Sequence, residues 1–491
     1  MSELPESLYR AAQVRELDRT AIEDHGIAGE TLMNRAGEMA FGILRGAWPR
    51  SGTLLIVAGP GNNGGDGYVV ARLAREAGLG VKLVFLGDPE RMRGDALSAR
   101  EAFLACGGEA RPWLGNLPPA DVIVDALLGT GLEREVEGAF RDVIDAMNAH
   151  AAPVIAIDIP SGLHSDAGVP MGAAVIADRT VSFIGLKQGL FTGSGRAVCG
   201  QVRFSDLGVP DVLYDAVEPS CVRMTLERFR DRLAPRSRCA HKGDFGHVLI
   251  VGGEAGMSGA ARLAGEAAAR TGAGLVSVAT RASHAGILNA TRPELMVRGV
   301  ECGADLDLLL SRATVVAIGP GLGQGDWGRE MLQRVLEAPQ PVVMDADALN
   351  LLSEAAPQRD GKRIMTPHPG EASRLLGCTI AEVQHDRFAA AQRIVDRYGG
   401  VVVLKGSGTL ICDAGRMALC DAGNPGMASG GMGDVLTGII SALAAQGLNL
   451  GDASRAGVCL HAAAADVAAA DGERGLLAGD LPPIVRTLAN P

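Results

Sequence analysis

Positive charge is the first thing that this chain lacks. Its 46 Lys and Arg are outnumbered by 57 Asp and Glu, which leaves a formal net charge of −11. Nucleic acids and acidic membrane surfaces are bound through clustered Lys and Arg, so the composition argues against both as partners. Anionic small molecules remain open as ligands, because the field of a binding site is local.

Paired cysteines and long apolar runs are also missing. The nine cysteines are odd in number and scattered, and none belongs to a CxxC motif. This pattern favours reduced thiols over a disulfide framework or a zinc site. The opening MSELPESLYR has no apolar signal core, and no run approaches the length of a membrane span. We therefore expect a cytoplasmic protein without a membrane partner.

Aromatic residues are scarce at 3%, whereas glycine is abundant at 67 residues. With Ala-rich helices, this composition suits close-packed α/β layers with glycine loops around ligands. A chain of 491 residues exceeds one ordinary core. We expect two domains, residues 1–215 and 225–491. The joint between them has little periodicity and contains Pro210 and Pro219.

Strands alternate with helices in the first half, which predicts a parallel, doubly wound sheet. Two helices are expected within residues 8–47, and another ends at Glu76. Ligands of such sheets lie beyond the carboxyl ends of the strands. The expected strands are 53–58, 81–86, 121–125, 154–158, 180–184 and 201–204.

The loop GPGNNGGDG at residues 59–67 contains a GxGxxG match. Alone, this dinucleotide-binding signal is weak. Asn62, Asn63 and Asp66 fill the turn with side chains, whereas a Rossmann turn needs bare backbone there. The same residues can instead be turn chemistry that supports left-handed backbone angles. Both interpretations stay open at this point.

Oxygen-bearing side chains follow the next two strands. Asp125, Asp158 and Ser161, together with Asn63, could form a hard-oxygen pocket for a cation. Lys187 is the one basic candidate nearby, and we interpret it as a solvated loop lysine.

The second half restarts at residues 241–246 and again alternates strands with helices. Glycine and polar loops follow its strands, among them GPGLG, DAD, TPHPGE and KGSGT. The expected strands are 248–251, 275–279, 314–318, 342–345, 363–365, 401–404 and 410–413.

The stretch GNPGMASGGMGDVLTGII, residues 423–440, carries the strongest chemical signal. Its glycine tip, residues 430–433, runs into a helix start, where backbone N–H groups favour phosphate or an oxyanion. Asp434 at that start could simply cap the helix. Beside an anion site, however, a carboxylate would repel phosphate unless it acts as a base on a hydroxyl during phosphoryl transfer. We adopt this second interpretation.

Two further loops leave simpler alternatives open. His368 lies between two prolines before a helix, and a single His can be an inert surface residue. Residues 405–409 offer a lysine, N–H groups and hydroxyls to a nucleotide phosphate tail. They could equally be only a hairpin turn between two strands.

Taken in order, these motifs resemble one known family. GNNGGDG, DALLGTG and DIPSG in the first half, with GPGLG, DADALN, TPHPGE, LKGSGT and GNPGMASGGMGDVLTG in the second, are similar to the bifunctional NAD(P)H-hydrate repair enzymes. These join an NAD(P)H-hydrate epimerase to an ADP-dependent (6S)-NAD(P)H-hydrate dehydratase. The resemblance spans nearly the whole chain. It implies two three-layer αβα domains, an N-terminal Rossmann-like one and a C-terminal ribokinase-like one.

The resemblance also implies ligands and roles. The substrates would be the hydrates of NADH and NADPH (NADHX and NADPHX), with ADP as co-substrate and K⁺ in the epimerase. Phosphoryl transfer itself makes Mg²⁺ an expected cofactor of the dehydratase, with Asp345 and Asp347 as candidate ligands. Asp434 and Asp158 are the expected catalytic residues. The expected substrate contacts are Asn62, Asn63, Gly64, Gly65, Asp66, Gly129, Thr130, Gly131, Leu132, Glu133, Arg134, Glu135, Asp158, Ala260, Gly321, Gly323, His368 and Asp434. The expected nucleotide contacts are Lys405, Gly406, Ser407, Gly408, Thr409 and Gly433, and the expected K⁺ ligands are Asn63, Asp125 and Ser161.

Three other functions remain open. The second half could be a ribokinase-like kinase of a small vitamin alcohol, the first half could be a non-catalytic nucleotide-binding module, or the chain could be a dehydrogenase. Fused metabolic enzymes are often built from symmetric copies, so we expect a homo-oligomer.

Overall fold

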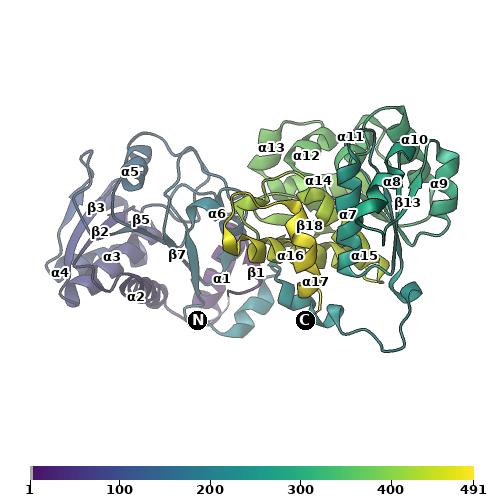
Figure 1. Ribbon diagram of the computed structural model, residues 1–491. Helices are drawn as coiled ribbons and strands as arrows, with labels where there is room; N and C mark the ends of the chain where they lie inside the picture. The colour runs from purple at the N-terminus through teal and green to yellow at the C-terminus, as the bar shows by residue number, and fades with distance from the viewer. Residues whose placement is uncertain (1–3, 491) are drawn as a thin grey trace. The chain divides into compact units, whose positions relative to one another are not determined.

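The computed structural model describes residues 4–490, which divide after Val222 into two compact units (Figure 1). Among these residues, no helix combines the length and apolar character that crossing a bilayer requires.

The first unit is built on a seven-stranded sheet in which every pairing is parallel. A short strand, β1 (Ser7–Tyr9), pairs in parallel with β8 (Leu186–Lys187) and antiparallel with β10 (Cys221–Arg223). In spatial order the sheet contains β4 (Ala110–Pro112), β3 (Gly80–Phe85), β2 (Thr53–Ala58), β5 (Val122–Ala126), β6 (Val154–Ile157), β7 (Arg179–Phe183) and β9 (Gln201–Ser205).

Helices cover both faces of this sheet. Alternate residues of β2 point to opposite faces, so Leu54 and Ile56 join one apolar core, and Leu55 and Val57 join the other. The first core is closed by helices α1 to α4, and the second by α5. The helices are α1 (Ala11–Glu23), α2 (Gly29–Ala47), α3 (Asn62–Glu76), α4 (Gly94–Ala105), α5 (Gly138–Asn148) and α6 (Gly195–Val198).

The second unit has a nine-stranded sheet that is parallel except for its last two pairings, which are antiparallel. In spatial order its strands are β13 (Met296–Gly299), β12 (Leu275–Thr280), β11 (His247–Val251), β14 (Val315–Ile318), β15 (Val342–Met344), β16 (Arg363–Met365), β17 (Val401–Leu404), β18 (Thr409–Asp413) and β19 (Arg416–Cys420).

Helices α7, α15, α16 and α17 form one packed group, of which α7, α15 and α16 contact this sheet, and α8, α9, α10 and α14 contact it as well (Figure 1). The bounds are α7 (Ser258–Thr271), α8 (Ala282–Thr291), α9 (Gly303–Leu310), α10 (Asp326–Glu337), α11 (Ala346–Glu354), α12 (Pro369–Leu376), α13 (Ile380–His385), α14 (Arg387–Tyr398), α15 (Met432–Ala445), α16 (Leu450–Ala468) and α17 (Leu481–Leu488).

The predicted fold class, two αβα layers around parallel sheets, is confirmed. Every predicted strand is present to within two residues at each end. Strands β1, β4, β8, β10, β13 and β19 were missed. Strands β4 and β13 are short edge strands with mostly exposed residues, and therefore lack an apolar signal.

One of the two interpretations left open for residues 59–67 is excluded. Asn62 to Asp66 form the first turn of α3, and no residue from 59 to 67 has a positive φ, so left-handed turn chemistry does not explain them. Close approach of backbone does explain two of the glycines. A Cβ on Gly64 would lie 1.9 Å from the carbonyl oxygen of Gly59, and one on Gly59 would lie 1.9 Å from that of Leu127.

Candidate active sites

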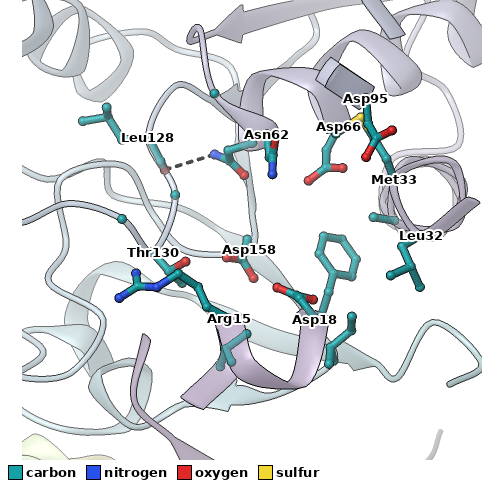
Figure 2. A pocket seen from close by; sticks show the side chains of 18 of the residues that line it. Arg15, Asp18, Leu32, Met33, Asn62, Asp66, Asp95, Leu128, Thr130 and Asp158 are labelled. Atoms are coloured by element: carbon teal, nitrogen blue, oxygen red, sulfur yellow. Dashed lines mark hydrogen bonds between the residues drawn. The ribbon is translucent and has the colours of Figure 1, made fainter. Parts of the chain in front are cut away.

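A cavity of about 760 Å³ opens in the first unit, beyond the carboxyl ends of β2, β5 and β6 (Figure 2). Such edges are where α/β sheets bind ligands. The structure brings most of the expected epimerase residues together there. Gly64 and Gly65 are buried in the first turn of α3, and Glu135 is not among the lining residues. The expected residues that line the cavity are Asn62, Asn63, Asp66, Gly129, Thr130, Gly131, Leu132, Glu133, Arg134 and Asp158.

An ion pair between Lys187 and Asp158 forms part of the wall of this cavity. Lys187, the last residue of β8, donates to the carboxylate of Asp158 and also to Ser182 Oγ at 3.1 Å and the carbonyl of Phe183 at 3.2 Å. The Lys187 side chain is 1% exposed and that of Asp158 is 17% exposed. Our interpretation of Lys187 as a solvated lysine is therefore wrong: the aspartate compensates its buried charge.

The backbone holds Asp158 in an unusual conformation. Its φ is 67°, in the left-handed region, and its N–H donates to Val181 at 2.7 Å. For any residue other than glycine this backbone conformation is unfavourable in free energy. Such strain is concentrated at functional sites. It turns the chain at the end of β6 so that the carboxylate points into the cavity (Figure 2).

Two more carboxyl groups point into the same space, Asp66 from α3 and Asp18 from α1 (Figure 2). Burial raises the pKa of Asp18 to about 6; Lys187 opposes this shift and Asp158 adds to it. Burial, and then the charges of Asp158 and Asp18, raise the pKa of Asp66 well above its ordinary value. Sequence reasoning found Asp66 but missed Asp18.

The three predicted K⁺ ligands also meet in this unit. Asp125 accepts hydrogen bonds from Ser161 Oγ at 2.5 Å and from Ser161 N at 2.8 Å. Asn63 donates to the carbonyl of Leu128 at 3.0 Å, and Ser161 Oγ donates to the same carbonyl at 3.1 Å. The buried side-chain oxygen of Asn63 has no hydrogen-bond partner among the described residues. An uncompensated buried oxygen is costly, and a cation would satisfy it.

A second ion pair lies at the carboxyl ends of β15 and β17. Lys405 Nζ donates to Asp345 Oδ1 at 2.6 Å and is 3.8 Å from Glu371. Thr437 Oγ donates to the other oxygen of Asp345 at 3.1 Å. Burial opposes charge on both partners, but their attraction outweighs it, so the pKa of Asp345 is lowered and that of Lys405 is raised.

The glycine turn meets this pair. Gly431 caps α15 with a φ of 91°, and the first intrahelical bond runs from Val435 N to Gly431 O. The N–H groups of Met432, Gly433 and Asp434 therefore have no intrahelical partner. A Cβ on Gly433 would lie 3.1 Å from Asp345 and 3.2 Å from Lys405, so no side chain separates the helix start from the ion pair.

Asp434 lies in the first turn of α15, half-buried. Burial raises its pKa to about 7; Asp345 adds to the shift, and Lys405 opposes it. A carboxyl group that titrates near neutral pH is suited to take a proton, because about half of it is unprotonated there and the carboxylate is a stronger base than an ordinary one.

Residues 405–408 connect β17 to β18 as a hairpin, so the simpler alternative describes the backbone correctly. A buried arginine lies beneath this connection. Arg387 of α14, with 1% of its surface exposed, donates to the carbonyls of Leu404, Lys405 and Gly408 at 3.2 to 3.4 Å. Because the guanidinium draws these carbonyls toward the interior, it fixes the shape of the loop. Sequence reasoning missed this residue.

The remaining expected residues of the second half lie in adjoining loops. His368 is the N-cap of α12, and its Nδ1 accepts from the N–H groups of Gly370 and Glu371. A Cβ on Gly321 would lie 3.3 Å from the side chain of Ala260. Gly323 N donates to Asp347 at 2.9 Å.

The Mg²⁺ candidates Asp345 and Asp347 are both occupied by protein donors: Asp345 by Lys405 and Thr437, and Asp347 by Gly323 and Gln324. Within residues 4–490, no group of three or more His, Cys, Asp or Glu could hold a metal ion. A Mg²⁺ site made by the protein alone does not fit these residues.

Two αβα units, each with a lysine–aspartate pair at the carboxyl ends of its strands, define the class of an α/β enzyme with two sites. The family comparisons agree. Residues 29–189 match the model of the YjeF-related protein N-terminus, and residues 248–486 match the model of NAD(P)H-hydrate dehydratase.

A bifunctional NAD(P)H-hydrate repair enzyme of Coxiella burnetii is 49% identical over 490 residues, which cover 99% of each chain. The second unit resembles a hypothetical protein of Streptococcus mutans of known structure, with 29% identity and a TM-score of 0.50 over 55% of this chain and 99% of that one. A Bacillus subtilis ADP/ATP-dependent NAD(P)H-hydrate dehydratase, co-crystallised with ATP and Mg²⁺, gives 33% identity and a TM-score of 0.49 over 54% of this chain and 96% of that one. The chain belongs to the family of bifunctional NAD(P)H-hydrate repair enzymes.

Proposed function

We propose that this protein repairs hydrated NADH and NADPH. The first unit interconverts the R and S epimers of the hydrate, and the second dehydrates the S form while ADP is converted to AMP and phosphate. Membership of the family supports both activities. The observation that carries the dehydratase is the half-buried carboxyl group of Asp434 beside the N–H groups that begin α15 and the Lys405–Asp345 pair.

The chemistry of the hydrate explains this arrangement. Its hydroxyl group is on the carbon next to the ring nitrogen, and hydroxide is a poor leaving group. Asp434 accepts the hydroxyl proton while the N–H groups at the start of α15 stabilise the phosphoryl group that moves from ADP to the oxygen. The ring nitrogen lone pair then expels phosphate, and loss of a proton from the neighbouring carbon restores the dihydropyridine.

The nucleotide lies, in this proposal, against residues 405–409 and Gly433. Lys405 supplies a positive charge close to Gly433, and Arg387 fixes the loop beneath. Ala260, Gly321, Gly323 and His368 would contact the hydrate. Mg²⁺ would arrive bound to the phosphates of the nucleotide, as it commonly does, and we assign it no protein ligands and no step.

Asn63, Asp125 and Ser161 would hold K⁺ in the first unit. Their neutral and carboxylate oxygens, including the unsatisfied oxygen of Asn63, suit a hard monovalent cation. The ion would fix the loop that follows β5. Asp158 would exchange protons with the substrate. We also propose that the protein is a cytoplasmic homo-oligomer.

The test is an incubation of mixed hydrate epimers with and without ADP, followed by the absorbance of the reduced nicotinamide. Asp434→Asn should leave ADP binding largely intact and lower turnover by about 10² to 10⁴-fold, as loss of a general base does. Asp452→Asn, in the first turn of α16, is a matched control. Near-normal turnover of Asp434→Asn would reject its role. A stable phosphorylated product in place of regenerated NADH would indicate a vitamin kinase.

A further inference from the structure

The cavity of the proposed epimerase contains more carboxyl groups than a single proton transfer requires. Besides the Asp158–Lys187 pair, it holds Asp18 and Asp66, which enter from two different helices (Figure 2). Neither of these two side chains forms a hydrogen bond or ion pair with another of residues 4–490. Partly buried carboxyl groups without protein partners are costly, which suggests that a ligand completes their environment.

Inversion at the hydroxyl-bearing carbon makes a specific demand on such a site. The hydroxyl group must leave from one face of the ring, and water must add to the other face. One face therefore needs an acid, and the opposite face needs a base.

We propose that Asp18 is a second catalytic residue of the epimerase and serves the face of the substrate opposite to Asp158. This inference rests on the proposed function of the first unit.

In the direction from R to S, which the slow phase of the test below reports, the step balances as follows. The carboxylic acid of Asp18 gives its proton to the hydroxyl group, the carbon–oxygen bond breaks, and the ring nitrogen lone pair forms a carbon–nitrogen double bond as water departs. A second water forms a new carbon–oxygen bond on the opposite face and gives its proton to the carboxylate of Asp158. Solvent then returns each carboxyl group to its starting state. The reverse direction exchanges the two roles.

Asp158, Asp18 and Asp66 differ in their surroundings, which suits them to different roles. Lys187 donates directly to Asp158 and holds its carboxylate at the cavity wall, where it can accept a proton from a bound water. Asp18, with a pKa of about 6, exchanges protons readily near neutral pH. Burial raises the pKa of Asp66 well above its ordinary value, and its protonated form can donate a hydrogen bond to the substrate. Asp18 interacts electrostatically with Asp66, Asp158, Lys187 and Tyr214. The other charged residues that line the same cavity are Arg15, Asp95, Glu133 and Arg134.

The second unit supplies an internal standard for the test. When the full-length protein receives both hydrate epimers with excess ADP, the S form is consumed in a fast phase. The R form follows in a slow phase that epimerisation limits. Asp18→Asn should lower the slow-phase rate by about 10²-fold, toward the uncatalysed rate, and leave the fast phase unchanged. Asp18→Glu should recover part of the loss, and Glu16→Gln, an exposed position on the same helix, should behave as wild type.

The pH dependence of the slow-phase rate distinguishes a catalytic role of Asp18 from a purely structural one. In wild type, the slow-phase rate should fall as the pH rises above about 6, because an acid must be protonated to act. The slow-phase rate of Asp18→Asn should not show this fall with rising pH. A slow phase within twofold of wild type, or a lowered one with unchanged pH dependence, overturns the assignment of Asp18. A wild-type slow phase no faster than the uncatalysed reaction overturns the epimerase function itself.

Discussion

The two units use the same pair of residues in opposite orientations. In the first, the lysine is the deeper partner, because Lys187 is 1% exposed and Asp158 is 17% exposed. In the second, the aspartate is the deeper partner, because Asp345 is 2% exposed and Lys405 is 19% exposed. The carboxylate therefore faces the ligand in one unit, and the ammonium faces it in the other.

This difference matches the chemistry proposed for each site. A proton is moved by a carboxylate, and a transferring phosphoryl group is stabilised by a cation and by N–H groups. The buried partner has a supporting role in both: it compensates the charge that the site displays. The comparison predicts that removing either partner lowers stability, because the other charge is left uncompensated, and that removing the displayed partner also affects catalysis directly.

The largest effect is expected for Lys187→Met. It would leave the Asp158 carboxylate without its counter-charge, which should lower the free energy of unfolding of the first unit by about 3–5 kcal/mol. Denaturant titration can follow this unit by tryptophan fluorescence in a Trp327→Phe background, since Trp48 and Trp113 are then the remaining tryptophans. Lys82→Met is the control. A loss below about 1 kcal/mol would show that the pair does not stabilise the unit.

Lys405→Met should affect catalysis directly, and it also leaves the buried Asp345 carboxylate without its counter-charge. Without the ammonium group beside Gly433, kcat/KM of the dehydratase should fall by about 10² to 10³-fold, as for other lost electrostatic stabilisers. Epimerisation should be unchanged. Regeneration of NADH at varied ADP concentration measures the effect, and the exposed Lys362→Met provides the matched control. Equal losses of both activities would contradict a local role.

The pH profile of the dehydratase should show the state of Asp434. Its pKa is raised to about 7, and a base acts only when unprotonated, so kcat should fall about tenfold per pH unit below that value. Steady-state rates at saturating ADP and hydrate, measured across this range, provide the check. A rate that stays constant down to about pH 5 would exclude Asp434 as the base.

The smallest effect is expected for Arg387→Lys. A lysine keeps the charge but cannot span the three carbonyls of Leu404, Lys405 and Gly408, so the loop should loosen. The KM for ADP should rise about tenfold, equivalent to about 1.4 kcal/mol, with a smaller change in kcat. Arg393→Lys, an exposed position on the same helix, is the control. A change in kcat alone would argue against a role in shaping the nucleotide loop.

The sequence predicts the strands and the loops at their carboxyl ends because apolar runs and glycine motifs are local signals. The depth of a charged residue is not local. Lys187 is two residues from Gly185 in a glycine-containing segment. No local sequence feature indicates that Asp158 compensates its charge. Arg387 is similar, because its partners are backbone carbonyls that only the folded hairpin assembles.

Asp18 was missed although a signal existed. It lies on the same face of α1 as the buried Val14, Leu17 and Ala21, at helical spacing. An acid within an apolar stripe is unusual and indicates either a satisfied buried group or a site. Its companion Asp158 lies far along the chain, so only the fold shows that the two share a cavity.

The left-handed backbone of Asp158 restricts what evolution can place there. Only glycine, asparagine and aspartate adopt such angles at little cost, whereas other residues lose about 1–2 kcal/mol before any chemistry is considered. A substitution at position 158 therefore lowers the stability of the fold as well as catalysis. Lineages that abandoned epimerisation should retain asparagine or glycine at this position far more often than alanine or a branched residue.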